Sequence, residues 1–185
     1  MKMLAAVALL VVGVFAAMSF AEKRRPGAAQ YVPPGFTPLE AGLPVALDVA
    51  GGRDKVYLQQ AVDPANINLL WSVRPVGDAV MFVSRVDGMA LDANGGKGNP
   101  YPRAADPANV NHLWVLAKVG ERYMIWSKVN GTVLDANGGK GRPYLSEKPD
   151  VRNVNHLWEL RPVGEFVMIV PAVRLMPLDL IDRLP

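Results

Sequence analysis

The chain has 185 residues, of which 50% are hydrophobic and 20% charged, so it holds enough apolar side chains for one folded domain and is not a disordered polymer. It has no cysteine and two histidines, which excludes disulfide scaffolds, thiol nucleophiles and zinc sites built from thiolates or three histidines. Four of the 20 basic and one of the 17 acidic residues lie in the first 25 positions, which leaves 16 of each sign from Pro26 onward. The body of the chain therefore lacks the cationic excess that neutralises phosphates, and we expect no nucleic-acid partner.

Residues 1–21 are predicted to be a signal peptide or a signal anchor. Met3–Ala21 is an apolar segment that follows Lys2 and has small residues, Ser19 and Ala21, at positions −3 and −1 before Glu22, as at a cleavage site. At about 1.5 Å rise per residue the same segment approaches the roughly 30 Å of a hydrocarbon core, so it would also serve as an uncleaved apolar helix that anchors the chain. The basic residues Lys23–Arg25 disfavour export of the chain on their C-terminal side. We expect a secreted, periplasmic or otherwise extracytoplasmic protein, with retention at the membrane as the alternative.

Residues 22–43 are predicted to form a linker, because positions 26–43 contain four prolines and three glycines and show no hydrophobic period. The next segment, residues 44–175, contains three copies of a unit of about 44 residues. Leu-Asp recurs at 47–48, 91–92 and 134–135, and tryptophan recurs at 71, 114 and 158. The heptapeptide DANGGKG occurs at 92–98 and 135–141, with a diverged copy at 48–54. Residues 176–185 are expected to form a C-terminal tail.

Each unit reads as four short strands separated by turns rich in Gly, Asn, Asp and Pro. In the second unit the pattern predicts strands over 89–93, 101–104, 112–117 and 122–128. Three units are too few for a propeller, which typically has four to eight blades. We therefore predict an all-β protein, a β-trefoil of pseudo-threefold symmetry with twelve strands, in which the three tryptophans are equivalent core residues.

The sequence resembles the ricin-type β-trefoil lectins. The unit of that family opens with a strand ending in Leu-Asp-Val, continues through a Gly-rich turn and closes on Gln-x-Trp preceded by Asn. Here the units open with Leu47-Asp48-Val49, Leu91-Asp92-Ala93 and Leu134-Asp135-Ala136. They close with Asn68-Leu69-Leu70-Trp71, Asn111-His112-Leu113-Trp114 and Asn155-His156-Leu157-Trp158.

The resemblance implies a shallow sugar pocket in each unit. The aspartate would accept hydrogen bonds from adjacent sugar hydroxyls, the asparagine would bond to one of them, and an aromatic side chain would stack on the C–H face of the ring. The matching residues are Asp92, Tyr101, Asn111 and His112 in the second unit, Asp135, Tyr144, Asn155 and His156 in the third, and Asp48, Tyr57 and Asn68 in the first. The first pocket is expected to be the weakest, because Leu69 stands where the others have histidine.

The sequence departs from the family at two places, and structural alternatives stay open. The motif glutamine is replaced by Leu69, His112 and His156, and the positions where the family usually has its stacking aromatic hold Gln59, Arg103 and Ser146. An aspartate before a Gly-rich turn commonly caps its own backbone, so the aspartates would serve folding without any ligand. The tyrosines would equally pack as a lid on the barrel, and the histidines would equally make structural hydrogen bonds.

No catalytic constellation, metal site or cofactor-binding motif is evident. The two histidines occupy equivalent positions in two units, and DANGGKG lacks the further carboxylates of a calcium loop. We expect a non-enzymatic, lectin-like module whose partners are glycans or glycoconjugates. The alternative is a non-lectin trefoil that serves as a scaffold subunit of a membrane protein complex, anchored through Met3–Ala21.

Overall fold

Twelve strands follow one another in the part of the chain that the computed structural model describes, residues 44–52, 54–60 and 62–173. Repeat 1 contains β1 (Val45–Asp48), β2 (Tyr57–Gln60), β3 (Trp71–Val76) and β4 (Ala79–Ser84). Repeat 2 contains β5 (Met89–Asp92), β6 (Tyr101–Ala104), β7 (Trp114–Val119) and β8 (Arg122–Ser127). Repeat 3 contains β9 (Val133–Asp135), β10 (Tyr144–Ser146), β11 (Leu157–Val163) and β12 (Phe166–Pro171). The prediction of four strands per unit is confirmed.

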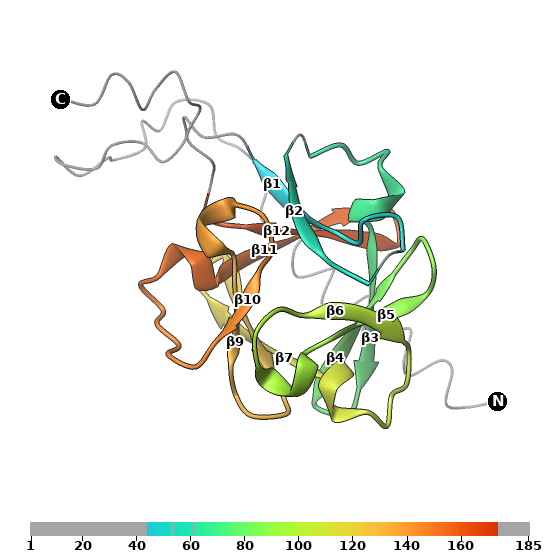
Figure 1. Cartoon of the computed structure of the whole chain (residues 1–185). Coiled ribbons are helices and arrows are strands. Elements are labelled where there is room, and N and C mark those ends of the chain that lie inside the picture. Colours follow the sequence, from blue (N-terminus) through green and yellow to red (C-terminus); the bar gives the residue numbers. More distant parts are fainter. Residues whose placement is uncertain (1–43, 53, 61, 174–185) are drawn as a thin grey trace, which may run out of the picture. The chain divides into compact units, whose positions relative to one another are not determined.

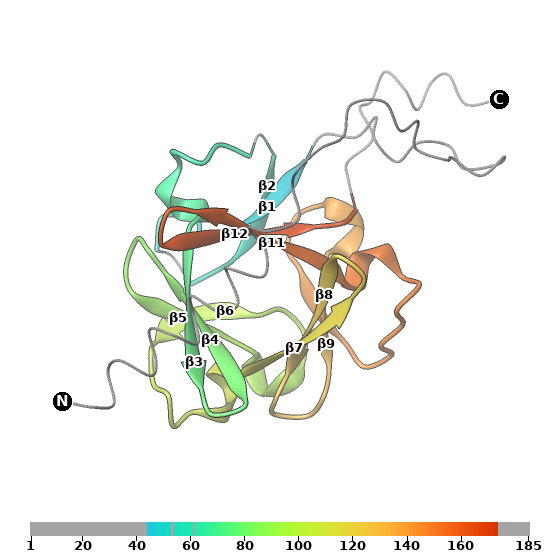
Figure 2. The ribbon, with the colours of Figure 1, turned by 180° about the vertical axis from the view of Figure 1, so that it is seen from behind.

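Six of these strands close a barrel. The pairs β3–β4, β7–β8 and β11–β12 are antiparallel hairpins, and they are joined to one another by the pairs β4–β7, β8–β11 and β12–β3. Each repeat therefore contributes its third and fourth strands to the ring, which is best followed from behind (Figure 2). A closed ring leaves none of its six strands as an open edge.

The first and second strands of each repeat form a separate hairpin over one end of the barrel. These hairpins are β1–β2, β5–β6 and β9–β10, and they surround a common centre (Figure 1). Three hairpins on a six-stranded barrel is the β-trefoil, so the predicted fold is confirmed.

One tryptophan from each repeat fills the core in the same way. Trp71, Trp114 and Trp158 are fully buried, as the sequence predicts for equivalent core residues. Each indole Nε1–H donates to a backbone carbonyl of the first strand in its own repeat, at 2.9–3.0 Å. The acceptor is always the leucine of the Leu-Asp motif, namely Leu47, Leu91 and Leu134. The tryptophan thus joins the barrel to the hairpin that contains the aspartate.

The segment before each tryptophan differs from the predicted strand. The sequence places a strand from His112, but Val110–His112 forms the 3₁₀ helix η4, and β7 begins at Trp114. The corresponding 3₁₀ helices are η2 (Ile67–Leu69) in repeat 1 and η6 (Val154–His156) in repeat 3. In each, the asparagine before the helix accepts a hydrogen bond at its side chain from the backbone two residues later, and this capping competes with strand formation.

The predicted signal or anchor segment 1–21, the linker 22–43 and the tail 176–185 lie outside the described residues. Within the described ranges, the structure has no helix of the length and hydrophobicity needed to cross a membrane.

Candidate functional site

The aspartate and the tyrosine of each predicted pocket lie directly opposite each other across a hairpin. Asp48 pairs with Tyr57, Asp92 with Tyr101, and Asp135 with Tyr144. Directly opposed side chains of an antiparallel pair have Cβ atoms about 4.5–5.5 Å apart and lie on the same face of the sheet. The structure therefore brings a carboxylate and a phenol ring together at the same place in all three repeats.

Each aspartate also holds the turn that follows it. In repeat 2, Oδ1 of Asp92 accepts a hydrogen bond of 2.6 Å from the backbone N–H of Asn94, and in repeat 3 Asp135 accepts one of 2.7 Å from Asn137. Asp48 caps Ala50 in the same way. The capped residues have positive φ angles of 49–54°, which is unusual for residues with a Cβ atom. The structural alternative for the aspartates is thus present in every repeat.

In repeats 2 and 3 the second carboxylate oxygen contacts a buried histidine. His112 Nε2 lies 3.1 Å from Asp92 Oδ2, and its Nδ1 lies 3.1 Å from the backbone nitrogen of Asp106. Nδ1 also lies 3.0 Å from the carbonyl oxygen of Asp106, and Nε2 lies 3.3 Å from Asn109 Nδ2, so both ring nitrogens have polar protein partners. His156 repeats this arrangement with Asp135 at 3.0 Å. Both histidines are 1% exposed, so they support the carboxylate from within and do not face a ligand.

The asparagine before each histidine reaches the same turn from the other side. Oδ1 of Asn111 accepts a hydrogen bond of 2.8 Å from the backbone N–H of Gly95, and its Nδ2 donates to Asn109 Oδ1 at 3.1 Å. Asn155 does the same with Gly138 and Asn153. In both repeats the predicted sugar-contacting asparagine therefore binds the protein's own backbone.

Sequence reasoning missed Asn109 and Asn153 as parts of these polar clusters. Both precede the 3₁₀ helix, and their side chains contact the histidine as well as the site asparagine. The recurring Asn-Val-Asn-His segment at 109–112 and 153–156 was the available signal.

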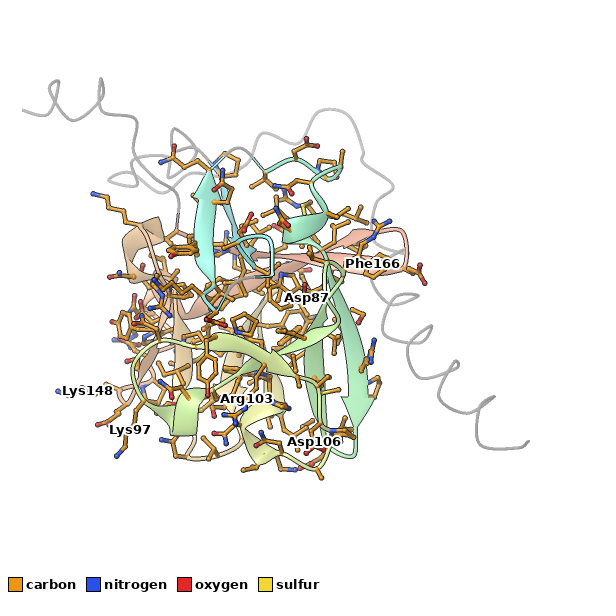
Figure 3. All side chains as sticks on the ribbon, turned by 45° about the vertical axis from the view of Figure 1, so that its right-hand side comes forward. Asp87, Lys97, Arg103, Asp106, Lys148 and Phe166 are labelled. Carbon is orange, nitrogen blue, oxygen red and sulfur yellow. The ribbon has the colours of Figure 1, made fainter. Side chains whose placement is uncertain are left out.

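The tyrosines remain partly accessible. Tyr144 is 37% exposed, and Tyr57 and Tyr101 are half-buried. Burial, and then the nearby Asp135 carboxylate, raise the pKa of the Tyr144 hydroxyl above its ordinary value. The Tyr101 hydroxyl accepts a hydrogen bond of 3.1 Å from Nη1 of Arg103, an exposed side chain of β6 (Figure 3). This bond, and then the nearby Asp92 carboxylate, raise the pKa of the Arg103 guanidinium.

Repeat 1 differs from the other two in the surroundings of its aspartate. An open depression of about 460 Å³ lies beside Tyr57 and is lined by Ala50, Asp54, Lys55 and Tyr57. Leu69 occupies the histidine position and is fully buried. Asp48 is 7% exposed, whereas Asp92 and Asp135 are each 2% exposed.

The described residues contain no group of three or more histidine, aspartate or glutamate side chains arranged to hold a metal ion. A polar cluster with an aromatic side chain at the surface can accept and donate hydrogen bonds to a neutral polar ligand and stack on its apolar face.

Comparison with family models and with curated proteins found no match for this chain. Among solved structures, the designed three-fold symmetric protein ThreeFoil is similar, with a TM-score of 0.53 and 20% identity over 62% of this chain and 89% of that protein. The GlcNAcα1-4Gal-releasing endo-β-galactosidase of Clostridium perfringens has a TM-score of 0.57 and 14% identity over 68% of this chain and 33% of the enzyme.

A lectin of Polyporus squamosus, solved with a human-type influenza-binding epitope, has a TM-score of 0.50 and 21% identity over 62% of this chain and 43% of the lectin. The chain thus spans about a third of the enzyme's length and less than half of the lectin's. These likenesses agree with the strand topology: the chain has the β-trefoil fold that ricin B-like lectins share.

Proposed function

We propose that the chain is a non-catalytic carbohydrate-binding module, secreted or associated with the cell envelope, with up to three shallow sites. The observation that supports this best is the threefold recurrence of an aspartate directly opposite a tyrosine on one face of a hairpin. A lectin and an endo-β-galactosidase are among the proteins with similar folds, which is consistent with this function.

The chemistry of the pair suits a sugar. A carboxylate offers about four acceptor positions, and the described contacts of Asp92 occupy one on each oxygen, so further acceptor capacity remains. An adjacent phenol ring offers an apolar face for the C–H side of a pyranose. Shallow sites of this kind bind weakly, at about millimolar affinity or −4 kcal/mol. Several such sites on one body would gain strength on a repetitive glycan surface.

A glycan array tests this function directly. The folded full chain should bind a subset of immobilised oligosaccharides, and the free sugar should compete for the binding. Asp92→Ala with Asp135→Ala, which the resemblance predicts to abolish binding, would also remove two turn caps and two histidine partners. Substituting Tyr57, Tyr101 and Tyr144 together separates binding from folding better, because these side chains are partly exposed and their loss should disturb the fold less. Absence of competable binding by folded protein would refute the proposal.

The internal hydrogen bonds favour a second candidate. In repeats 2 and 3 the side chains of the aspartate, asparagine and histidine all bind the protein itself, as expected of a trefoil that binds no sugar. Such a protein would act as an interaction or scaffold subunit of a membrane complex, held there by residues 1–21. A negative array followed by co-purification with a membrane complex would support this candidate.

A further inference from the structure

We infer that the sugar-binding site lies in repeat 1 alone, and that the corresponding polar groups of repeats 2 and 3 fold their own turns; this rests on the proposed carbohydrate-binding function. The ligand class is a sugar that presents two adjacent hydroxyls to Asp48 and Asn68 and a C–H face to Tyr57. This order reverses the one that the sequence suggests, in which repeat 1 is the weakest.

The carboxylate of Asp48 is more available than its two counterparts. In repeats 2 and 3 one oxygen caps the turn and the other contacts histidine. In repeat 1 one oxygen caps Ala50, but Leu69 has no polar side-chain atom to contact the other. Among the described residues that second oxygen has no hydrogen-bond partner, and Asp48 is the most exposed of the three aspartates. An ionised oxygen in this state gains from a hydroxyl donor.

The side chain of Asn68 is likewise available. Its counterpart Asn111 binds the N–H of Gly95 and the side chain of Asn109, and Asn155 makes the equivalent two bonds. The Asn68 carboxamide makes no hydrogen bond within the described ranges, although the backbone of Asn68 keeps its bonds to Asn66 and Val49. A carboxamide without a protein partner supplies both a donor and an acceptor to a ligand.

A proline removes one of the backbone hydrogen bonds that join the repeats at the rim of the depression. Around the pseudo-threefold axis, Leu145 N–H donates to Gly98 C=O at 2.7 Å, and Leu58 N–H donates to Gly141 C=O at 2.8 Å. At the third junction, the residue equivalent to the donors Leu58 and Leu145 is residue 102. The residue equivalent to the acceptors Gly98 and Gly141 is Asp54. Residue 102 is proline, which has no N–H. The loop carrying Asp54 and Lys55 therefore lacks the cross-repeat bond that holds its two counterparts.

The depression lies beside Tyr57 at the loop of Asp54 and Lys55 and has room for a sugar ring, whereas Asp48 and Asn68 are not among its lining residues. Its volume of about 460 Å³ falls within the roughly 300–1,000 Å³ of small-molecule sites. Tyr57 supplies the ring, and the exposed Asp54 and Lys55 add an acceptor and a donor at the rim. The residues equivalent to Lys55 in the other repeats are Asn99 and Arg142. The side chain of Asn99 donates a hydrogen bond to the carbonyl of Pro143, and that of Arg142 donates one to the carbonyl of Pro100.

Two matched pairs of variants of the full chain test the inference by calorimetric titration with the strongest competable oligosaccharide from an array of neutral and acidic sugars. Asn68→Ala should weaken binding at least about tenfold without lowering the melting temperature, because it breaks no described side-chain bond. Asn111→Ala should lower the melting temperature and keep the affinity of the fraction that folds. Tyr57→Leu and Tyr101→Leu form the second pair, which holds even if Asn111→Ala fails to fold.

Loss of binding in Tyr57→Leu with full binding in Tyr101→Leu is the expected result. Full binding in Tyr57→Leu and Asn68→Ala, with loss in Tyr101→Leu, would overturn the choice of repeat 1 but leave the carbohydrate-binding function standing. No binding of any sugar by the folded wild-type chain would overturn both.

Discussion

At the scale of single residues, Gly96 shows how closely the turn between two repeats packs on a Gly-rich turn. Its φ is +74°, and a Cβ atom there would lie 2.0–2.2 Å from the side-chain amide of Asn130 in the β8–β9 turn. Asn130 Nδ2 in turn donates to Gly96 C=O at 3.2 Å. A Cβ atom at Gly52 in repeat 1 would lie 2.8 Å from Oδ2 of Asp87 in the β4–β5 turn.

We predict that Gly96→Ala destabilises the protein by more than Gly95→Ala does. Gly95 also has a positive φ, of 66°, but a Cβ atom there would meet nothing within 4 Å, so it should cost about 1–2 kcal/mol for backbone strain alone. Gly96→Ala adds the clash with Asn130. Urea denaturation measures the loss of stability in each variant. Combining Asn130→Gly with Gly96→Ala should remove the part of the loss that comes from the clash and leave the part that comes from backbone strain. Equal losses in the two single variants would contradict this contact.

The buried histidine pairs are the second residue-scale feature. We predict that His112→Leu, which copies the repeat 1 residue Leu69, costs about 3 kcal/mol, because it leaves Asp92 Oδ2 without its histidine partner and removes the contact of Nδ1 with the Asp106 backbone. His156→Leu should cost a similar amount in urea denaturation because its contacts are equivalent. A change below about 0.5 kcal/mol in both variants would show that these contacts do not support the fold.

Tyr144 gives a prediction for alkaline pH. Burial and Asp135 raise its pKa, so the folded protein keeps this proton to a higher pH than the unfolded chain. The resulting stabilisation is present below the unfolded pKa of about 10 and is lost as the pH rises through the folded pKa. Thermal melts between about pH 8 and 11 should therefore show a steeper loss of stability for wild type than for Tyr144→Phe. Parallel curves would contradict the raised pKa.

At the scale of elements, the three hairpins form a ring that is hydrogen-bonded at two junctions. Pro102 is the reason that the junction from repeat 2 to repeat 1 lacks the bond. We predict that Pro102→Leu, which copies Leu58 and Leu145, adds a slowly exchanging amide at position 102. Its stability should change by less than about 1 kcal/mol, because the new hydrogen bond offsets the greater freedom of the unfolded chain.

Amide hydrogen exchange followed by NMR checks the new bond. The same variant should weaken sugar binding, because tying the Asp54 loop narrows the depression in repeat 1. A rapidly exchanging amide at position 102 would show that the junction stays open for another reason.

The strands were predictable from the sequence because strand, turn and repeat signals coincide three times. The equivalent tryptophans and the positive φ of Asn94, Gly95 and Gly96 follow from the same pattern. The predicted start of β7 was wrong, because Asn109 caps a 3₁₀ helix and local side-chain bonding overrides the β propensity of Val110. The absent junction bond needs the register between repeats, which sequence alone does not supply.

At the scale of the whole molecule, the fold is threefold symmetric but its surface is not. The sequence groups the aspartates with the tyrosines because the repeat aligns them, and each pair lies opposed across a hairpin. Which atoms of those residues are free was not predictable, since it depends on contacts with Asn109, Gly95 and the backbone of Asp106. The pattern shared by three repeats therefore predicts which residues lie together, whereas the departures, such as Leu69 in place of histidine, decide which of their polar atoms bind the protein itself.

The most direct test is an NMR titration of the ¹⁵N-labelled full chain with the oligosaccharide that the array selects. The account predicts saturable shifts that concentrate on the amides of the 48–59 segment and on Asn68, with one site per chain. The corresponding amides of repeats 2 and 3 should stay unchanged. Equal shifts in all three repeats, or none at any sugar concentration, would contradict it.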